Sequence, residues 1–241
     1  MVFRWFSKRL SQRSANYLNA LIILFCYVSG KTTYRKSETK SNINLDQLQH
    51  TLHNYRITDL KRDFLKQRPV AVWITGLPAS GKSTLASNLE KALLERGFFT
   101  QWLDGDYLRN GLTKDLSFTD DDQEENVRRS AEVAKLFLES NIITICTFIS
   151  ASERLRTLAR DIIGTSQFLE VYANCPLEVC VQRDDKNMYG RALHGGVTNL
   201  SGVNFPYEPP RFPWLQLYTS YHSVDDCTNQ LLEALLPRIK I

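Results

Sequence analysis

The sequence lacks the cysteine spacing of a zinc-binding or disulfide-rich protein. Its five cysteines are scattered, odd in number and without a C-x-x-C pair. Structural zinc sites and small secreted scaffolds use closely spaced sets of cysteines. The sequence therefore predicts no zinc site and favours a reducing compartment, and we expect Cys146 and Cys175 to be small buried hydrophobic residues.

Acidic residues are missing from the first 37 positions, which contain seven lysines and arginines. The whole chain has a net charge of only +4, so the remaining positions are slightly acidic. Domains that bind nucleic acid present a strongly basic face. No nucleic-acid partner is therefore expected.

The N-terminal part also lacks an apolar run long enough to span a membrane. The apolar patch at residues 18–28 is shorter than the ~20 residues that a spanning helix needs. Its basic flank leaves a signal sequence, a transit peptide and a membrane anchor as alternatives, and no other feature supports membrane association. We therefore divide the chain into an N-terminal basic and apolar extension (1–45) and a folded domain (46–241), expected in the cytoplasm unless the extension directs it to an organelle.

The folded domain contains a phosphate-binding loop motif. The apolar, β-branched run at 70–75 predicts a buried strand, and leucines four residues apart after position 84 predict an amphipathic helix. The residues between them match G-x-x-x-x-G-K-[ST], in which backbone N–H groups surround phosphates at a helix N-terminus. Lys82 is expected to reach the outer phosphates, and the Ser83 hydroxyl to hold Mg²⁺. The candidate ATP-binding residues are Gly76, Leu77, Pro78, Ala79, Ser80, Gly81, Lys82, Ser83 and Thr84.

Two carboxylates follow the second predicted strand, which covers residues 98–103. Asp104 and Asp106 flank a glycine at the carboxyl end of this strand, where ligands gather in parallel α/β sheets. Such a pair can handle magnesium or accept a proton from a hydroxyl group. The alternative is that either residue only caps an ordinary turn.

Helices and strands alternate in the rest of the domain. Helices are expected at 119–140, 153–163, 176–183 and 224–235, and strands at 142–149, 168–173 and 215–219. This alternation predicts an α/β fold of the P-loop NTPase type, a three-layer sandwich with a mostly parallel central sheet and helices on both faces. The stretch 184–213 has little periodicity and is expected to form a functional lid or a binding loop. Of Arg128 and Arg129, one faces phosphate or both form a solvated pair.

Several motifs together resemble the adenylylsulfate (APS) kinase family. The resemblance covers about residues 55–219 and includes the phosphate loop, L-D-G-D at 103–106 and P-Y-E-P-P at 206–210. The other matching segments are 107–112, 114–118, 125–129, 131–137, 148–150, 170–172, 176–180 and 182–184. The resemblance implies a P-loop kinase that moves the γ-phosphoryl group of ATP to the 3′-hydroxyl of APS, making PAPS, with Mg²⁺ as cofactor and usually as a homodimer.

The resemblance also implies roles for individual residues. Arg109 is expected to pair with phosphate or sulfate, and Phe118 to stack on the adenine of APS. The family's phosphoserine-intermediate position falls on Ser150; because acceptor hydroxyls in P-loop kinases usually attack in line, Ser150 could instead orient the substrate. The substrate-binding candidates are Asp106, Arg109, Phe118, Asn126, Ile149, Ser150 and Lys186, and the catalytic candidates are Lys82, Asp104, Asp106 and Ser150.

Departures from the family pattern fall almost entirely on the acceptor side. Gln123 stands where the family has an arginine that contacts APS, and Ala151 and Ser152 follow Ser150 where the family has proline and an aromatic residue. The lid sequences at 186–193 and 199–202 also differ. Two alternatives therefore stay open: a kinase of this fold that uses another nucleotide-like 3′-hydroxyl, and a nucleotide-binding relative without turnover.

Overall fold

The computed structural model describes residues 59–196 and 199–241. The described part begins with a helical segment at residues 59–65. The N-terminal extension lies outside the described residues, so its boundary at residue 45 and its targeting role stay predictions. Among the described residues, no helix combines the length and apolar character needed to cross a membrane.

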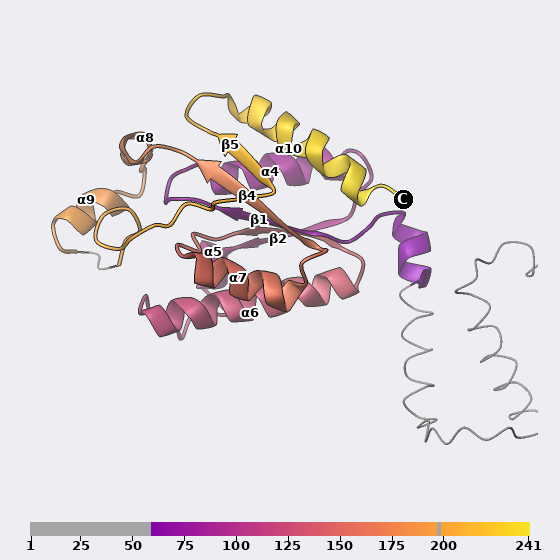
Figure 1. Ribbon diagram of the computed structural model, residues 1–241, viewed down its shortest axis with the longest axis horizontal. Coiled ribbons are helices and arrows are strands. Elements are labelled where there is room, and N and C mark those ends of the chain that lie inside the picture. The colour runs from indigo at the N-terminus through magenta and orange to yellow at the C-terminus, as the bar shows by residue number, and fades with distance from the viewer. Residues whose placement is uncertain (1–58, 197–198) are drawn as a thin grey trace, which may run out of the picture. The chain divides into compact units, whose positions relative to one another are not determined.

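The core is a five-stranded sheet in which every neighbouring pair of strands is parallel. The strand order is β2-β3-β1-β4-β5 (Figure 1). The predicted mostly parallel sheet is therefore confirmed, and each predicted strand is found within two residues of its expected start. The strands are β1 (Ala71–Thr75), β2 (Thr100–Asp104), β3 (Ile143–Thr147), β4 (Phe168–Asn174) and β5 (Leu215–Tyr218).

Four long helices cover the two faces of this sheet. Helices α4 (Lys82–Leu94) and α10 (Val224–Ile239) pack on one face, and α6 (Asp120–Glu139) and α7 (Glu153–Ile163) pack on the other (Figure 1). Successive side chains of β1 point to opposite faces of the sheet. Val72 and Ile74 pack in the core beneath α4 and α10, and Trp73 packs in the core beneath α6 and α7. All four helices were predicted, although α10 continues to Ile239 instead of ending at 235.

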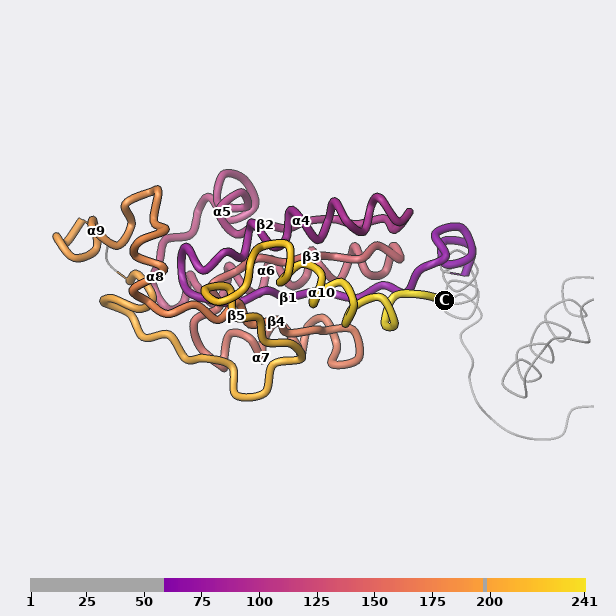
Figure 2. Tube along the Cα trace, turned by 90° about the horizontal axis from the view of Figure 1, so that it is seen from above, coloured from indigo at the N-terminus to yellow at the C-terminus, as the bar shows by residue number. Residues whose placement is uncertain are grey.

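Three short helices were absent from the prediction or differ from it. Helix α5 (Gly105–Leu108) follows β2, α8 (Leu177–Gln182) is shorter than expected, and α9 (Met188–Leu193) lies inside the stretch expected to be irregular. Helices α8 and α9 lie together at the end of the domain toward which the strands point (Figure 2). A small core that contains the buried Cys175, Cys180 and Tyr189 packs beneath them. Cys146 is buried as well, as predicted.

A buried glutamine joins the amino ends of three strands. Gln67 has no exposed surface; its Nε2 donates to the carbonyls of Phe99 (2.8 Å) and Asn141 (2.9 Å), and its Oε1 accepts the Phe99 N–H (2.8 Å). The Asn141 side chain returns a hydrogen bond to the Gln67 carbonyl at 3.0 Å. These contacts fix the starts of β1, β2 and β3 relative to one another, at the edge opposite the site described below.

Replacing Gln67 by the similarly shaped methionine should lower the free energy of unfolding by about 2–4 kcal/mol, because a backbone N–H and two carbonyls lose their buried partner. Urea unfolding measures the change. Gln230→Met, at an exposed position of α10, is the matched control and should change stability by less than about 0.5 kcal/mol. Equal effects of the two substitutions would show that the buried contacts contribute nothing.

Candidate active site

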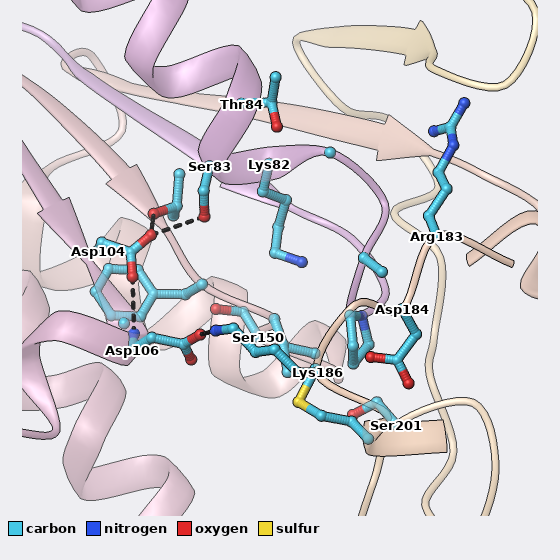
Figure 3. A pocket seen from close by; sticks show the side chains of 18 of the residues that line it. Lys82, Ser83, Thr84, Asp104, Asp106, Ser150, Arg183, Asp184, Lys186 and Ser201 are labelled. Atoms are coloured by element: carbon cyan, nitrogen blue, oxygen red, sulfur yellow. Dashed lines mark hydrogen bonds and ion pairs between the residues drawn. The ribbon is translucent and has the colours of Figure 1, made fainter. Parts of the chain in front are cut away.

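The phosphate loop and both predicted carboxylates open onto one cavity at the carboxyl edge of the sheet (Figure 3). Its volume is about 1000 Å³. Three residues of the phosphate loop do not line the cavity. Gly76 and Ser80 are buried, and Leu77 packs against the small core under α8 and α9. The remaining predicted site residues line the cavity: Pro78, Ala79, Gly81, Lys82, Ser83, Thr84, Asp104, Asp106, Arg109, Phe118, Asn126, Ile149, Ser150 and Lys186.

The phosphate loop needs its glycines for two different reasons. A Cβ atom on Gly76 would lie 2.6 Å from the Ser80 Oγ and 2.7 Å from the carbonyl oxygen of Ala173 on β4, so no side chain fits there. Gly81 has φ +94°, a backbone conformation that L side chains rarely adopt, and it begins α4 as the residue before Lys82. The loop can therefore turn tightly against the sheet and direct the first N–H groups of α4 into the cavity.

Lys82 extends from the start of α4 into the cavity (Figure 3). Its ammonium group donates to the carbonyls of Gly76 (2.9 Å) and Leu77 (2.6 Å). Burial lowers the pKa of this ammonium to about 8, and the nearby carboxylates of Asp106 and Asp104 oppose the shift. A desolvated ammonium with only carbonyl partners is suited to attract an anionic group such as a polyphosphate.

The Asp104 carboxylate ties the phosphate loop to two strands. Its Oδ2 accepts hydrogen bonds from the Ser83 hydroxyl (2.8 Å) and the Thr147 hydroxyl (2.8 Å), which in turn accepts the Trp102 indole N–H at 3.0 Å. Its Oδ1 accepts the backbone N–H groups of Asp106 (3.0 Å) and Tyr107, and thereby caps α5. The capping role that the sequence left as an alternative is therefore present, together with a direct contact to the phosphate loop.

Asp106 is placed differently from Asp104. Its side chain is 75% exposed, and its Oδ2 forms an ion pair of 2.6 Å with the Lys186 ammonium, which comes from the segment between α8 and α9. The contact with Asp106 raises the pKa of Lys186. This ion pair joins the end of β2 to the predicted lid across the cavity (Figure 3).

An aromatic ring and a guanidinium group together form another wall of the cavity. The Arg109 guanidinium lies 4.0 Å from the centre of the Phe118 ring, within cation–π distance. Its Nη1 also donates to the carbonyls of Leu116 (3.3 Å) and Ser117 (3.1 Å). Phe118 is 53% exposed, so its ring remains accessible to a planar ligand group.

The predicted acceptor residues that follow β3 and lie on α6 are more buried. The Ser150 hydroxyl is buried and accepts the Trp73 indole N–H at 3.2 Å, and Ser150 has φ +43°, an uncommon conformation for a residue other than glycine. Ile149 is held through its carbonyl by the Thr75 hydroxyl at 2.6 Å. Asn126 is also buried, and its Oδ1 has no partner among the described residues, which leaves one acceptor beside the cavity.

The residues that sequence reasoning missed come mainly from the lid and from the loop after β5. The buried Tyr189 donates its hydroxyl to the Pro78 carbonyl at 2.9 Å, so α9 contacts the phosphate loop directly. Arg183 donates to the Thr219 carbonyl (3.0 Å), and the Thr219 hydroxyl donates to the Ser80 carbonyl (2.8 Å). Each contact joins residues far apart in sequence, and no local pattern marks them.

One of the two alternatives for the arginine pair on α6 is wrong. Arg129 forms ion pairs with Asp115 (2.7 Å) and Glu125 (2.8 Å), and Arg128 binds the same Glu125 at 2.6 Å. Neither arginine lines the cavity. Glu125 between them satisfies both guanidinium groups, so they form a surface network instead of a phosphate contact.

Comparisons with known proteins find similar sequences and structures for the folded part of the chain. The sequence model of the adenylylsulphate kinase family matches residues 68–218. An adenylyl-sulfate kinase of Bacteroides fragilis (strain YCH46) is 46% identical over 179 residues, which cover 74% of this chain and 89% of that protein. The Mycobacterium tuberculosis APS kinase CysC in complex with AMPPNP and APS superposes with a TM-score of 0.67 and 38% identity, over 70% of this chain and 98% of that one. A hexameric APS kinase from Thiobacillus denitrificans superposes with a TM-score of 0.54 and 28% identity, over 70% of this chain and 29% of that one.

Gly76→Ala should weaken binding of a non-hydrolysable ATP analogue by about 10- to 100-fold, because the new Cβ atom must displace the phosphate loop or β4. Isothermal titration calorimetry measures the affinity. Gly111→Ala is the matched control, since a Cβ atom there meets nothing within 4 Å, and its affinity should equal that of the unaltered protein. Unchanged binding by Gly76→Ala would refute the assignment of this loop.

Proposed function

The chain belongs to the adenylylsulfate kinase family, and we propose that it transfers the γ-phosphoryl group of ATP to the 3′-hydroxyl of APS, producing PAPS and ADP. One observation carries this proposal for the chain's own residues. The phosphate loop and the wall formed by Arg109 and Phe118 line the same cavity, so a triphosphate and a nucleotide acceptor can face each other in it.

In this proposal the phosphate loop binds ATP, and the wall formed by Arg109 and Phe118 binds APS. Lys82 draws charge from the transferring phosphoryl group, because its ammonium lies at the phosphate loop and the residue lines the cavity. Phe118 stacks on the acceptor base, and Arg109 supplies the positive charge for its phosphate or sulfate. The unpartnered Asn126 Oδ1 offers an acceptor to a hydroxyl or amino group of the nucleotide.

The two aspartates then have separate roles. Both oxygens of Asp104 already accept hydrogen bonds, so this residue orders the phosphate loop. Within the described part of the chain, the Asp106 side chain forms one ion pair, the exposed contact with Lys186, so we propose that its carboxylate orients the 3′-hydroxyl and receives its proton. As the bond from the 3′-oxygen to the γ-phosphorus forms, the bond to the bridging oxygen of ADP breaks.

Magnesium fits the oxygen atoms that the site provides. The Ser83 hydroxyl and Asp104 Oδ2 lie 2.8 Å apart at the end of the phosphate loop, and Mg²⁺ prefers oxygen ligands while keeping several waters or phosphate oxygens. We propose that these two residues hold it, directly or through water. When bound with ATP, the ion would neutralise charge that develops on the phosphate oxygens.

Ser150 is proposed to orient the acceptor loop and to form no phosphoserine. Its hydroxyl is buried and engaged with Trp73, while its carbonyl accepts a hydrogen bond from the buried Arg156 at 2.8 Å. A nucleophile would need free access to the γ-phosphorus. Direct transfer between the two bound nucleotides needs no such access.

A homodimer is the proposed assembly, as the family resemblance implies; the similar APS kinase from Thiobacillus denitrificans, of which this chain covers 29%, is described as hexameric. Light scattering of the full chain measures it directly. A dimer gives a mass near twice 27.8 kDa. A mass near that of one chain, or near six chains, would refute the dimer.

The purified full chain with ATP, Mg²⁺ and APS should release ADP and form PAPS, detected by chromatography. A panel that includes nucleotides with a phosphoramidate or a sugar group in place of the sulfate tests the alternative acceptors. Turnover with one of these but not with APS would overturn the proposed substrate. ATP binding without turnover on any acceptor would overturn the proposed kinase activity.

Lys82→Ala should reduce kcat by at least about 10²–10³-fold, because the transferring phosphoryl group loses a preorganised positive charge. Steady-state assays with APS and ATP measure the loss. Lys91→Ala, in an exposed position of the same helix, controls for removal of a lysine and should retain normal kcat. Near-normal turnover by Lys82→Ala would contradict the role given to this residue.

A further inference from the structure

The carbonyl oxygen of Phe118 accepts hydrogen bonds from two side-chain amides, one from the nearby start of α6 and one from the distant lid. Gln123 Nε2, in the first turns of α6, lies 3.0 Å from this oxygen. Asn199 Nδ2, from the lid segment that follows α9, lies 2.8 Å from it. All three residues line the cavity. Because a carbonyl oxygen has two lone pairs, the two amides use its full accepting capacity.

The backbone that these amides hold also determines where the Phe118 ring lies. Arg109 covers the ring at 4.0 Å and donates to the carbonyls of Leu116 and Ser117, the two residues before Phe118. Three consecutive carbonyls are therefore held by side chains, and the ring itself stays half exposed. A ring fixed in this way loses little conformational freedom when a planar base stacks on it.

Gln123 is engaged with the protein in this arrangement. Its amide nitrogen points to the Phe118 carbonyl, and a neutral amide supplies no charge to an anionic acceptor. Asn199 binds the same carbonyl although it lies 81 positions away in sequence. Its φ of +65° is one that asparagine tolerates better than most residues. Through Asn199 the lid contacts the acceptor wall, whereas through Tyr189 it contacts the phosphate loop.

We propose that Gln123 and Asn199 are positioning residues that clamp the Phe118 carbonyl, set the ring for stacking on the acceptor base and tie the lid to the acceptor half of the cavity. The proposal rests on the proposed function, since it concerns the acceptor of the same reaction. The clamp predicts a selective effect. Loss of either amide should raise the KM for the acceptor and leave the KM for ATP nearly unchanged.

Asn199→Gly and Gln123→Met remove the two amides with little other disturbance. Glycine adopts the positive φ of residue 199 without strain, and methionine keeps the length of the glutamine side chain. Each variant should raise KM for APS by about 3- to 10-fold, the effect of one hydrogen bond, with kcat and KM for ATP within about 2-fold of normal. Asn187→Gly is the matched control. Asn187 is a lid residue with φ +51° that forms no hydrogen bond with Phe118 in the described part of the chain, so its substitution should leave KM for APS unchanged.

The same two substitutions in a Phe118→Ala background separate positioning from a merely structural role. Phe118→Ala keeps the carbonyl and removes the ring, so the clamp then has nothing to position. Neither substitution should raise KM for APS further in this background. Three results would overturn the clamp. The first is an increase in KM for APS in this background equal to that in the unaltered protein. The others are an equal increase in KM for ATP, and no increase in KM for APS in either background.

APS turnover by the unaltered chain is measured first, so that failure of the clamp can be distinguished from failure of the proposed function. Absence of APS turnover by that chain would refute APS as substrate, and the KM comparison would then use whichever 3′-hydroxyl acceptor of the panel is phosphorylated. If the chain phosphorylates an acceptor and neither substitution changes the KM for that acceptor, the clamp is refuted and the proposed kinase activity is not.

Discussion

Four hydrogen bonds converge on the Asp104 carboxylate, and the geometry of the site depends on them. They come from Ser83 at the start of α4, from Thr147 at the end of β3, and from two N–H groups of α5. The parallel sheet brings the ends of β1, β2 and β3 to one edge, and this carboxylate fixes the loops that leave them. The phosphate loop and the start of the acceptor wall are thereby held in one arrangement before any ligand binds, as preorganised catalysis requires.

The lid completes the site by contacting both halves of the cavity. Tyr189 bonds to the phosphate loop, Lys186 pairs with Asp106, and Asn199 bonds to the Phe118 carbonyl. A kinase must exclude water from the γ-phosphate, since water would otherwise act as acceptor. In the proposed reaction, the contacts of the lid with both the phosphate loop and the acceptor wall serve this exclusion. The buried Ser150 is joined to Trp73 of β1 through its hydroxyl and to Arg156 of α7 through its carbonyl.

The sequence predicted the parts of the fold that local pattern controls. The phosphate loop, its strand and helix, and the four long helices were found because periodicity and glycine spacing mark them. Placement of Asp104 and Asp106 at the cavity followed from the rule that strand ends meet at one edge. The division of labour between these two aspartates could not be predicted, nor could the Tyr189 and Asn199 contacts, because they depend on partners distant in sequence. The six residues of α9 are too few to show a helical period.

We propose that the phosphoryl group passes directly from ATP to the acceptor inside one cavity. The configuration at phosphorus distinguishes this route from a two-step route, using ATPγS made chiral at the γ-phosphorus with oxygen isotopes and APS as acceptor. One in-line displacement inverts the configuration, so direct transfer should give inversion. Retention would require two successive displacements, as through a phosphorylated Ser150, and would refute direct transfer.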